Sequence, residues 1–252
     1  MVSAVWYKDT LNVGDNLTPF ILSRFFNEEV TFSSSSPRWI ISGSILDWSK
    51  EGDILCGVGT FDFIKPLQFH VVALAVRGPL TADKILDEPK ALGDGGLLVP
   101  KVYSPPKQTG DKLGIIPHYV EYPSVKARYP NAFVINVMQS VENFLRELFQ
   151  CRMVLSSSLH GIVLAEGYGI PAFRGSFGRS HNIYSFDFKH RDYYEGTGRS
   201  LPEITSIDDF LRENVDLIQK REELKKVKDT QEKLWEVFTE YAAKYKTDAK
   251  DA

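Results

Sequence analysis

The sequence predicts an α/β protein of two halves, each built on a parallel sheet, followed by a helical C-terminal segment. Short apolar runs that end in small residues alternate with segments of helical spacing. A polar stretch with two prolines, residues 103–111, divides this series. The 252 residues suffice for two small domains with a core each. We expect the halves to span residues 1–104 and 112–205, and helices at 206–246 to pack across both.

Composition excludes several classes of function. Hydrophobic residues make up 43% and charged residues 25% of the chain, as in ordinary globular proteins. The 30 Lys and Arg against 33 Asp and Glu give no reason to expect nucleic acid as a ligand. Metal-ligand spacing is absent. The two cysteines, Cys56 and Cys151, lie in apolar runs, which predicts buried free thiols in a reducing compartment.

The N-terminus has neither the basic start nor the long apolar stretch of a signal peptide. No run of about 18 apolar residues occurs anywhere in the chain. We therefore expect a cytoplasmic protein without an integral membrane segment. Contact with the inner face of the membrane through a lipid-linked substrate stays open.

In the first half, residues 2–7 have the pattern of a strand and residues 17–26 that of a helix. The turn between them combines glycine with small polar residues, which can cap the helix or hold a phosphate or carboxylate on backbone amides. Capping and ligand contact are both open here. The candidates in this turn are Asn12, Gly14, Asp15 and Asn16.

Three further buried strands are predicted at residues 39–44, 54–60 and 71–76, each ending in small or polar residues. In an open α/β sheet, ligands bind beyond the carboxyl ends of the strands. Arg77 emerges at such an end, and its planar fork of donors suits a carboxylate or phosphate. The alternative is a salt bridge that closes the strand end. Asp94 lies at a second strand end, on a flexible glycine tip.

The second half repeats the pattern, with strands at residues 113–119, 132–137 and 152–155 and a helix at 141–149. The last of these strands leads through Ser156, Ser157 and Ser158 into a helix that begins near His160. A helix N-terminus offers free N–H groups and the positive end of its dipole. The junction therefore predicts an anion site that His160 faces.

After a last strand at residues 171–176, we predict that residues 177–199 form an aromatic and basic loop. Such a loop is either solvated surface or a cover for the neighbouring anion site. Cations near this region are candidates for ligand binding: Arg174, Arg179 and Lys189.

From Ser206 the remainder is predicted to be helical, starting with a Ser-x-x-Asp cap through Asp209. A narrow apolar stripe on an otherwise charged helix indicates a strap that packs on both halves. A helix that binds a partner protein is the alternative. The stripe consists of Leu224, Val227, Leu234, Phe238 and Tyr241, around a polar Gln231.

Taken in order, these motifs resemble those of the polysaccharide pyruvyl transferase family. The matching segments are residues 12–16, 57–59, 77–81, 92–94, 114–119, 156–171 and 192–194. The resemblance implies two facing Rossmann-like halves, as in GT-B-like glycosyltransferases. It also implies a role in exopolysaccharide biosynthesis without a cofactor: transfer of the pyruvyl group of phosphoenolpyruvate to two hydroxyls of a glycan repeat unit, which forms a ketal and releases phosphate.

This chemistry requires a proton for the enol carbon and a base for the sugar hydroxyls. Within the family resemblance, we expect His160 to be the general acid and His118 a second proton donor or a phosphate contact. Asp94 is expected to bind acceptor hydroxyls or act as a base. Cationic side chains are expected to hold the donor's anionic groups: Arg77 first, then Arg174, Arg179 and Lys189.

The chain departs from the family pattern at two places. Some members carry an arginine two residues before the motif histidine, where this chain has Ser158. A cation needed there must come from elsewhere, such as Arg174 or Arg179. Gly95 and Gly96 stand where a proline and an alanine are often seen. Two alternatives remain: a nucleotide-sugar glycosyltransferase of the same architecture, and a non-catalytic protein that binds anions or glycans.

Overall fold

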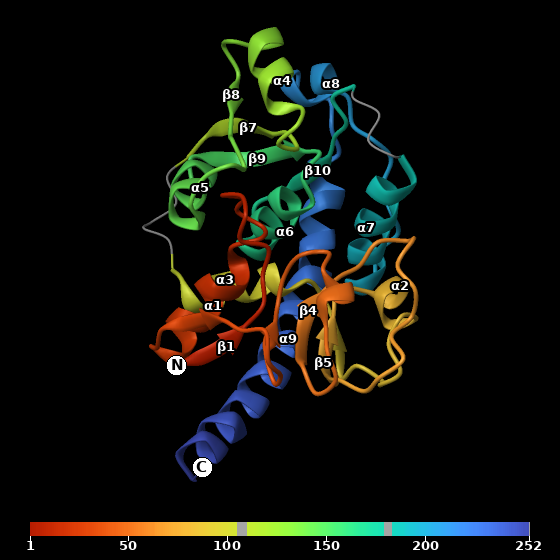
Figure 1. Cartoon of the computed structure of the whole chain (residues 1–252). Coiled ribbons are helices and arrows are strands. Elements are labelled where there is room, and N and C mark those ends of the chain that lie inside the picture. Colours follow the sequence, from red (N-terminus) through yellow and green to blue (C-terminus); the bar gives the residue numbers. More distant parts are fainter. Residues whose placement is uncertain (105–109, 179–182, 252) are drawn as a thin grey trace.

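The computed structural model describes residues 1–104, 110–178 and 183–251, and it contains two parallel sheets. One sheet has six strands in the order β2-β1-β3-β4-β5-β6, and the other has four in the order β10-β9-β7-β8. All strand pairs in both sheets run parallel. The two sheets form the lower and upper parts of the molecule in Figure 1. The α/β class with two Rossmann-like halves is confirmed.

The six-stranded sheet belongs to the first half. Its strands are β1 (Val2–Ala4), β2 (Val30–Phe32), β3 (Trp39–Ile40), β4 (Ile54–Val58), β5 (Val72–Val76) and β6 (Ala91–Leu92). Its helices are α1 (Leu17–Phe26), α2 (Pro79–Ala82) and α3 (Val99–Val102), with 3₁₀ turns η1 (Leu46–Trp48) and η2 (Gly95–Leu98). All five residues of β4 are buried, as their apolar run predicts for a central parallel strand. Helix α1 has the predicted bounds.

The four-stranded sheet belongs to the second half. Its strands are β7 (Lys112–Ile116), β8 (Phe133–Val134), β9 (Cys151–Ser156) and β10 (Ala172–Arg174). The helices beside it are α4 (Tyr122–Arg128), α5 (Val141–Leu148) and α6 (Leu159–Gly167). Helix α5 starts at Ser140, whose hydroxyl accepts a hydrogen bond from the Asn143 amide. Helix α6 is buried on nearly all sides, since it lies between β9 and the first half.

Residues 177–199 were predicted to form a loop, and this prediction is wrong. Residues Ile183–Gly196 form helix α7, which packs against α2 of the first half. Its buried side chains at His190, Tyr193 and Tyr194 recur at helical spacing. Neighbouring residues bind opposite halves: Asp192 accepts hydrogen bonds from Arg77, and the Tyr193 hydroxyl donates to Glu166 on α6.

The C-terminal segment contains α8 (Ile207–Leu211) and the long α9 (Leu217–Asp251). The predicted cap is present, because the Asp209 amide donates to the Ser206 hydroxyl. Helix α9 contacts β4, β5, β6 and η2 of the first half and α6 of the second. The Gln231 side-chain amide donates to the carbonyls of Leu97 and Gly167, one in each half, at 2.8 and 3.1 Å. Helix α9 therefore straps the halves together, as predicted.

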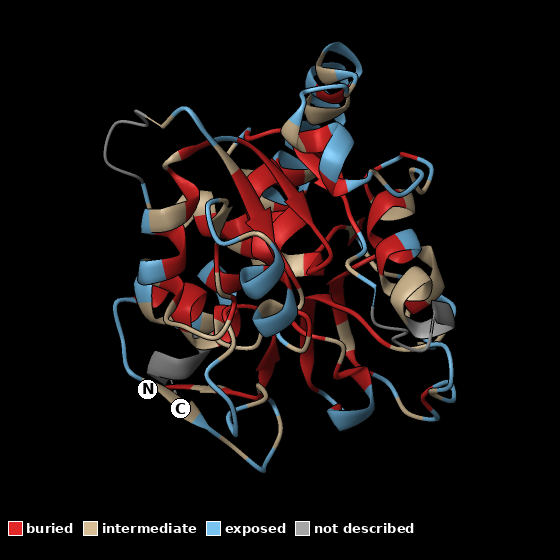
Figure 2. Ribbon diagram, turned by 90° about the horizontal axis from the view of Figure 1, so that it is seen from above, coloured by how far each residue is buried: buried red, intermediate tan, exposed pale blue. Residues whose placement is uncertain are grey.

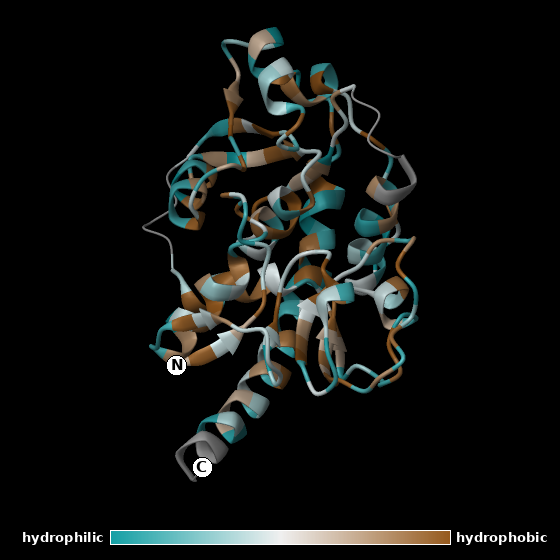
Figure 3. Ribbon diagram, viewed as in Figure 1, coloured by the Kyte–Doolittle hydropathy of each residue, from teal (hydrophilic) through white to brown (hydrophobic). Residues whose placement is uncertain are grey.

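One hydrophobic core cluster includes residues of both halves and of α9. Buried residues follow the strands and the helix faces that meet them (Figure 2). Hydrophilic and hydrophobic residues alternate along α9 (Figure 3), as expected for a helix with one packed face. Cys56 and Cys151 are buried free thiols, as predicted. Across the described residues, every helix is either too short or too polar to cross a bilayer.

Candidate functional site

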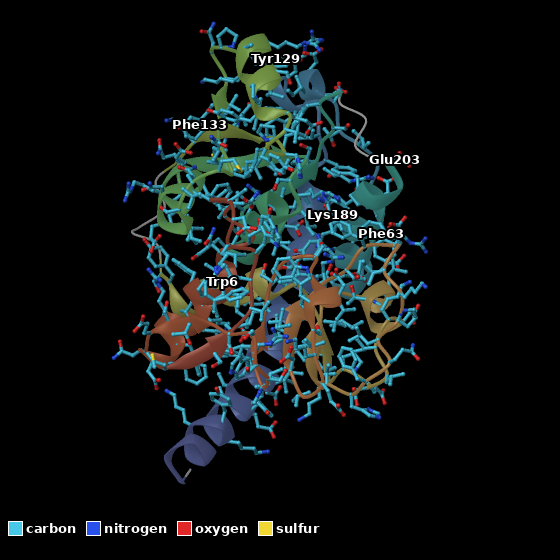
Figure 4. All side chains as sticks on the ribbon, viewed as in Figure 1. Trp6, Phe63, Tyr129, Phe133, Lys189 and Glu203 are labelled. Carbon is cyan, nitrogen blue, oxygen red and sulfur yellow. The ribbon has the colours of Figure 1, made fainter. Side chains whose placement is uncertain are left out.

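A cavity of about 440 Å³ lies between the two halves. Helix α7 also contributes to its wall, and Figure 4 shows Lys189 of this helix between the two sheets. The lining residues are Tyr7, Asn12, Asp15, Gly43, Ser44, Ile45 and Phe61 of the first half, His118, Tyr119, Ser158, Leu159 and His160 of the second, and Phe186 and Lys189 of α7. The predicted cleft between strand ends is therefore a real cavity with polar and aromatic walls.

His160 lies in the first turn of α6, next to the N-cap residue Ser158. Its Nε2 is 3.1 Å from the Ser42 hydroxyl, which is 3.0 Å from the Gly14 carbonyl oxygen. A carbonyl only accepts, so Ser42 donates to Gly14, and the His160 Nε2–H donates to Ser42. This assigns the lone pair of the neutral imidazole to Nδ1. His160 thus reaches across from the second half and is held by the first.

Gly14 is needed for this approach. A Cβ at this position would lie within 2.5 Å of the Nδ1, Cγ and Cε1 atoms of His160. The glycine of the predicted anion-binding turn therefore serves to admit the imidazole ring, and it does not line the cavity itself. Of the neighbouring candidates, Asn12 and Asp15 line the cavity. Asn16 is the N-cap residue of α1, but its side chain donates to the Asn12 carbonyl and neither caps the helix nor reaches the cavity.

Three titratable groups of the cavity have shifted pKa values. Burial lowers the pKa of His160 to about 3, with help from the positive charges of Lys189 and Arg77. Burial and Arg77 lower the pKa of Lys189 to about 8, while Asp15 and Glu121 oppose the shift. Burial raises the pKa of Asp15 to about 6, against the pull of Lys189. At pH 7 the cavity therefore holds a neutral imidazole, a charged ammonium and an ionised carboxylate.

Arg77 does not line the cavity, and its side chain is only 1% exposed. Its Nε donates to Asp192, its Nη1 to the Ser44 hydroxyl and its Nη2 to the Thr60 carbonyl, all at 2.8–2.9 Å. These contacts correspond to the salt-bridge alternative and correct the expectation that Arg77 holds the donor. Arg77 instead fixes Asp192 of α7 and two segments of the first half that border the cavity.

Asp94 is fully buried and lies behind His160, outside the cavity lining. Its Oδ1 accepts from the Gly96 amide at 2.9 Å and caps η2. The same oxygen is 3.9 Å from the His160 Nε2, too far for a hydrogen bond. Burial raises the pKa of this carboxyl to about 6. Because Asp94 lies in the interior, it does not face the cavity where acceptor hydroxyls were expected to meet it. Its charge instead acts on the His160 ring from the interior side.

Of the three serines, only Ser158 lines the cavity. The Ser156 hydroxyl lies 2.8 Å from the Ile116 carbonyl oxygen and accepts from the Ser158 amide. The Ser157 hydroxyl donates to Glu121 at 2.5 Å and accepts from the His118 amide. Ser156 and Ser157 are therefore interior residues that shape the β9 to α6 junction, which corrects their expected role in direct substrate binding.

His118 is placed in the cavity by this serine network. Its ring packs against Tyr119, with ring centroids 4.5 Å apart. The two predicted histidines therefore share one cavity, although they come from different strand ends of the second half. The described residues include no cluster of three or more histidine, cysteine or acidic side chains that could hold a metal ion.

The remaining predicted cations differ in position. Arg174 is buried and outside the cavity lining, where it pairs with Asp187 and donates to the Pro202 carbonyl. It lies 5.3 Å from the centre of the Phe186 ring and so supports a residue that lines the cavity. This corrects its expected contact with the donor. Arg179 lies outside the described residues. Lys189 lines the cavity.

Several residues that line the cavity or hold a lining residue were not predicted from the sequence. Ser42 is hydrogen-bonded to His160. The sequence showed only that Ser42 belongs to a group of small residues at the end of a strand. The aromatic wall was not predicted, because its members lie far apart in the chain and belong to loops, turns and the missed helix α7. These residues are Tyr7, Phe61, Tyr119 and Phe186.

Comparison with known proteins identifies the family. A protein-family model described as "Polysaccharide pyruvyl transferase" matches residues 14–174, well over half of the chain. An uncharacterized protein of Acanthamoeba polyphaga mimivirus, L143, is 23% identical over 232 residues, with 81% of each chain covered. No solved structure matches. The matched segment contains the turn at Gly14 and the motif of His160, which meet at the cavity. The chain belongs to the polysaccharide pyruvyl transferase family, a family of transferases.

Proposed function

We propose that the protein transfers the pyruvyl group of phosphoenolpyruvate to two hydroxyls of a glycan sugar, with release of phosphate. The observation that supports this most is the cavity itself. It combines a helix N-terminus at Ser158, an ammonium group at Lys189 and two histidines, His118 and His160. Phosphoenolpyruvate carries a phosphate and a carboxylate on one small carbon frame, and an anion site beside proton-transfer groups matches that demand.

Lys189 takes the place of the missing motif arginine in this proposal. Burial and the charge of Arg77 destabilise its positive charge and lower its pKa to about 8. A bound phosphate or carboxylate supplies the opposite charge and stabilises the ammonium form. The positive end of the α6 dipole, which begins at Ser158, acts on the same anion. His118 serves as a second contact for the phosphate or as a second proton donor.

The reaction needs no net acid or base. One sugar hydroxyl adds to C2 of phosphoenolpyruvate while C3 gains a proton and becomes a methyl group. The C2–O bond to phosphate then breaks, and the second hydroxyl adds to the resulting oxocarbenium ion to close the ketal. Of the two hydroxyl protons, one ends on C3 and the other on the departing phosphate. A proton carrier near C3 and the hydroxyls therefore suffices.

His160 is that carrier in our proposal. Its pKa of about 3 leaves the imidazole neutral. As the hydroxyl adds to C2, the imidazole relays the proton of that hydroxyl to C3 and so acts as the general acid. The anionic donor and the Asp94 carboxyl, 3.9 Å from Nε2, stabilise the positive charge during this step. The Ser42 hydrogen bond keeps the ring in one orientation meanwhile.

We further propose that the acceptor is a repeat unit of an exopolysaccharide or capsule. A lipid-linked unit would bring the protein to the inner face of the membrane in the cytoplasm. The family description supports a polysaccharide acceptor. The proposed halves, residues 1–104 and 112–205, would each supply one wall of the site.

The test is to incubate the protein with phosphoenolpyruvate and a broad panel of glycans, and to measure released phosphate together with an acid-labile ketal. Replacement His160→Asn should lower the rate by about 10²- to 10⁴-fold, the usual contribution of a general acid or base. His70→Asn is the matched control, because His70 is an exposed residue that pairs with Asp87 and does not line the cavity. It should leave the rate unchanged.

Thermal-shift measurements separate the proposal from a nucleotide-sugar glycosyltransferase. A ligand that binds the folded state raises the melting temperature, so phosphoenolpyruvate should raise it and uridine or guanosine diphosphate should not. Absence of a shift with phosphoenolpyruvate, together with no ketal on any acceptor, would refute the proposed function. Binding of phosphoenolpyruvate without turnover would instead indicate a non-catalytic binding protein.

A further inference from the structure

We infer that an aromatic surface beside the cavity binds the sugar units next to the reacting one, so that the acceptor is an oligosaccharide or polysaccharide and not a single sugar. The aromatic surface is defined here as Tyr7, Trp48, Phe61 and Phe63. This inference rests on the proposed transfer to a glycan for the identity of the ligand. It goes further by assigning a separate site for the acceptor chain.

The aromatic surface begins inside the cavity and continues outside it. Phe61 lines the cavity, and the ring of Phe63 stacks on it with a centroid distance of 5.3 Å and an interplanar angle of 7°. Phe63 is 69% exposed. Figure 4 shows Phe63 at the edge of the six-stranded half, on the side that carries Lys189. Two parallel rings thus form a platform that leads from the cavity to the surface.

A second aromatic pair also leads from the cavity to the surface, with its rings tilted by 51° to each other. Tyr7 lines the cavity, and its ring centroid lies 5.9 Å from that of Trp48, which is 38% exposed. The second half adds Tyr119, a lining residue that is 47% exposed. Aromatic side chains therefore surround the cavity opening. Two of them, Tyr7 and Phe61, each contact a second aromatic ring that is exposed to solvent. Exposed aromatic rings grouped in this way indicate a binding surface.

The backbone presents Phe63 on a fixed turn. The Ile64 amide donates to the Phe61 carbonyl, and the Phe63 amide donates to the Asp62 carboxylate at 3.0 Å. The start of the turn is anchored at the Thr60 carbonyl, which accepts from Arg77 at 2.8 Å. Although one face of the Phe63 ring stacks on Phe61, most of its apolar surface stays in water, which costs free energy. A ligand that covers the ring would recover it.

A carbohydrate chain fits this surface better than other ligands do. One face of a pyranose ring carries mostly C–H groups, which pack on an aromatic ring while the hydroxyls at the rim stay in water. Flat, parallel rings suit such a face, whereas insertion into a membrane calls for apolar side chains that project as a wedge. The surface is also continuous with the cavity in which the sugar hydroxyls are proposed to react. Successive sugars of one chain could therefore occupy Phe61 and Phe63 in turn.

The experiment uses an array of immobilised carbohydrates, from single sugars to hexasaccharides, prepared from bacterial and fungal polysaccharides. Binding of the labelled full-length protein is measured without phosphoenolpyruvate. We expect retention of at least one oligosaccharide and much weaker retention of its single sugars. Phe63→Ala should weaken the oligosaccharide about tenfold and leave single sugars unchanged, as expected from the loss of one stacking contact. Phe63→Trp should preserve binding.

Leu86→Ala is the matched control, since Leu86 is an exposed apolar residue of the same half that does not line the cavity. It should bind like the parent. Absence of retention on the whole array, or equal retention by Phe63→Ala, would overturn the inference. So would Phe63-dependent binding to phosphatidylglycerol vesicles in place of glycans. Because the array involves no turnover, failure of pyruvyl transfer with intact glycan binding would count against the proposed function alone.

Discussion

Gly14 gives the sharpest test of how the two halves build the site. In Gly14→Ala, the new methyl group would lie within 2.5 Å of three ring atoms of His160. Non-bonded heavy atoms in contact normally lie about 3.5–4.0 Å apart, and the nearest ring atom, Nδ1, would be only 1.9 Å away, so the ring must retreat by more than about 1 Å. That shift breaks the 3.1 Å hydrogen bond between His160 and Ser42. A displacement of this size at a catalytic group costs about 10²-fold in rate.

We therefore expect Gly14→Ala to lower kcat for pyruvyl transfer about 100-fold, with a loss of about 1–3 kcal/mol in the free energy of unfolding from overpacking. Ketal formation gives the rate and urea denaturation gives the stability. Gly167→Ala is the control, since its Cβ would meet nothing closer than 3.4 Å. In a His160→Ala background the methyl group has room, so Gly14→Ala should cause no further loss. Full activity of the single variant, or losses that multiply in the double variant, would refute this reasoning.

Three more predictions follow from described contacts. Lys189 is charged below its pKa of about 8 and neutral above it. The Kd for phosphoenolpyruvate should therefore rise by up to about tenfold per pH unit above pH 8, where the phosphate itself no longer titrates. Calorimetric titration should show a Kd independent of pH in this range for Lys189→Met, and an equal slope in both proteins would contradict the role of Lys189. Arg77→Met leaves the buried Asp192 carboxylate without its cation, so denaturation should show a loss of about 3–5 kcal/mol; a loss below 1 kcal/mol would disprove this. Gln231→Leu leaves two carbonyl groups without their donor and should cost about 1–3 kcal/mol by the same measurement, whereas Gln219→Leu on the exposed face of α9 should cost almost nothing.

The parts of the fold that follow from local pattern could be predicted from the sequence. The junction from β9 to α6 was predicted because an apolar run, three serines and a helical spacing follow each other directly. Helix α7 was missed, although His190, Tyr193 and Tyr194 form a buried stripe. Charged residues between them hid this stripe, since burial of aromatic and histidine side chains is far less certain from sequence than burial of aliphatic ones.

The roles of the site residues depended on partners far away in the chain. Arg77 has the chemistry of an anion-binding residue, but its partner Asp192 is 115 positions later. The Ser42 contact that orients His160 spans 118 positions. No local pattern reports such pairings. The sequence could therefore indicate which residues gather near the strand ends, and only the three-dimensional contacts separate those that line the cavity from those that support it.

The opposite contacts of Asp192 and Tyr193 have a consequence for folding cooperativity. Tyr193 is bound to Glu166 within the second half, whereas Asp192 is bound to Arg77 of the first, so neither half can complete its buried polar contacts alone. We therefore expect that the segment between the halves does not separate two independently folding units. The whole chain should unfold in a single calorimetric transition, with a calorimetric enthalpy equal to the van't Hoff enthalpy. Fragments made by cutting this segment should be stable only as a complex with each other.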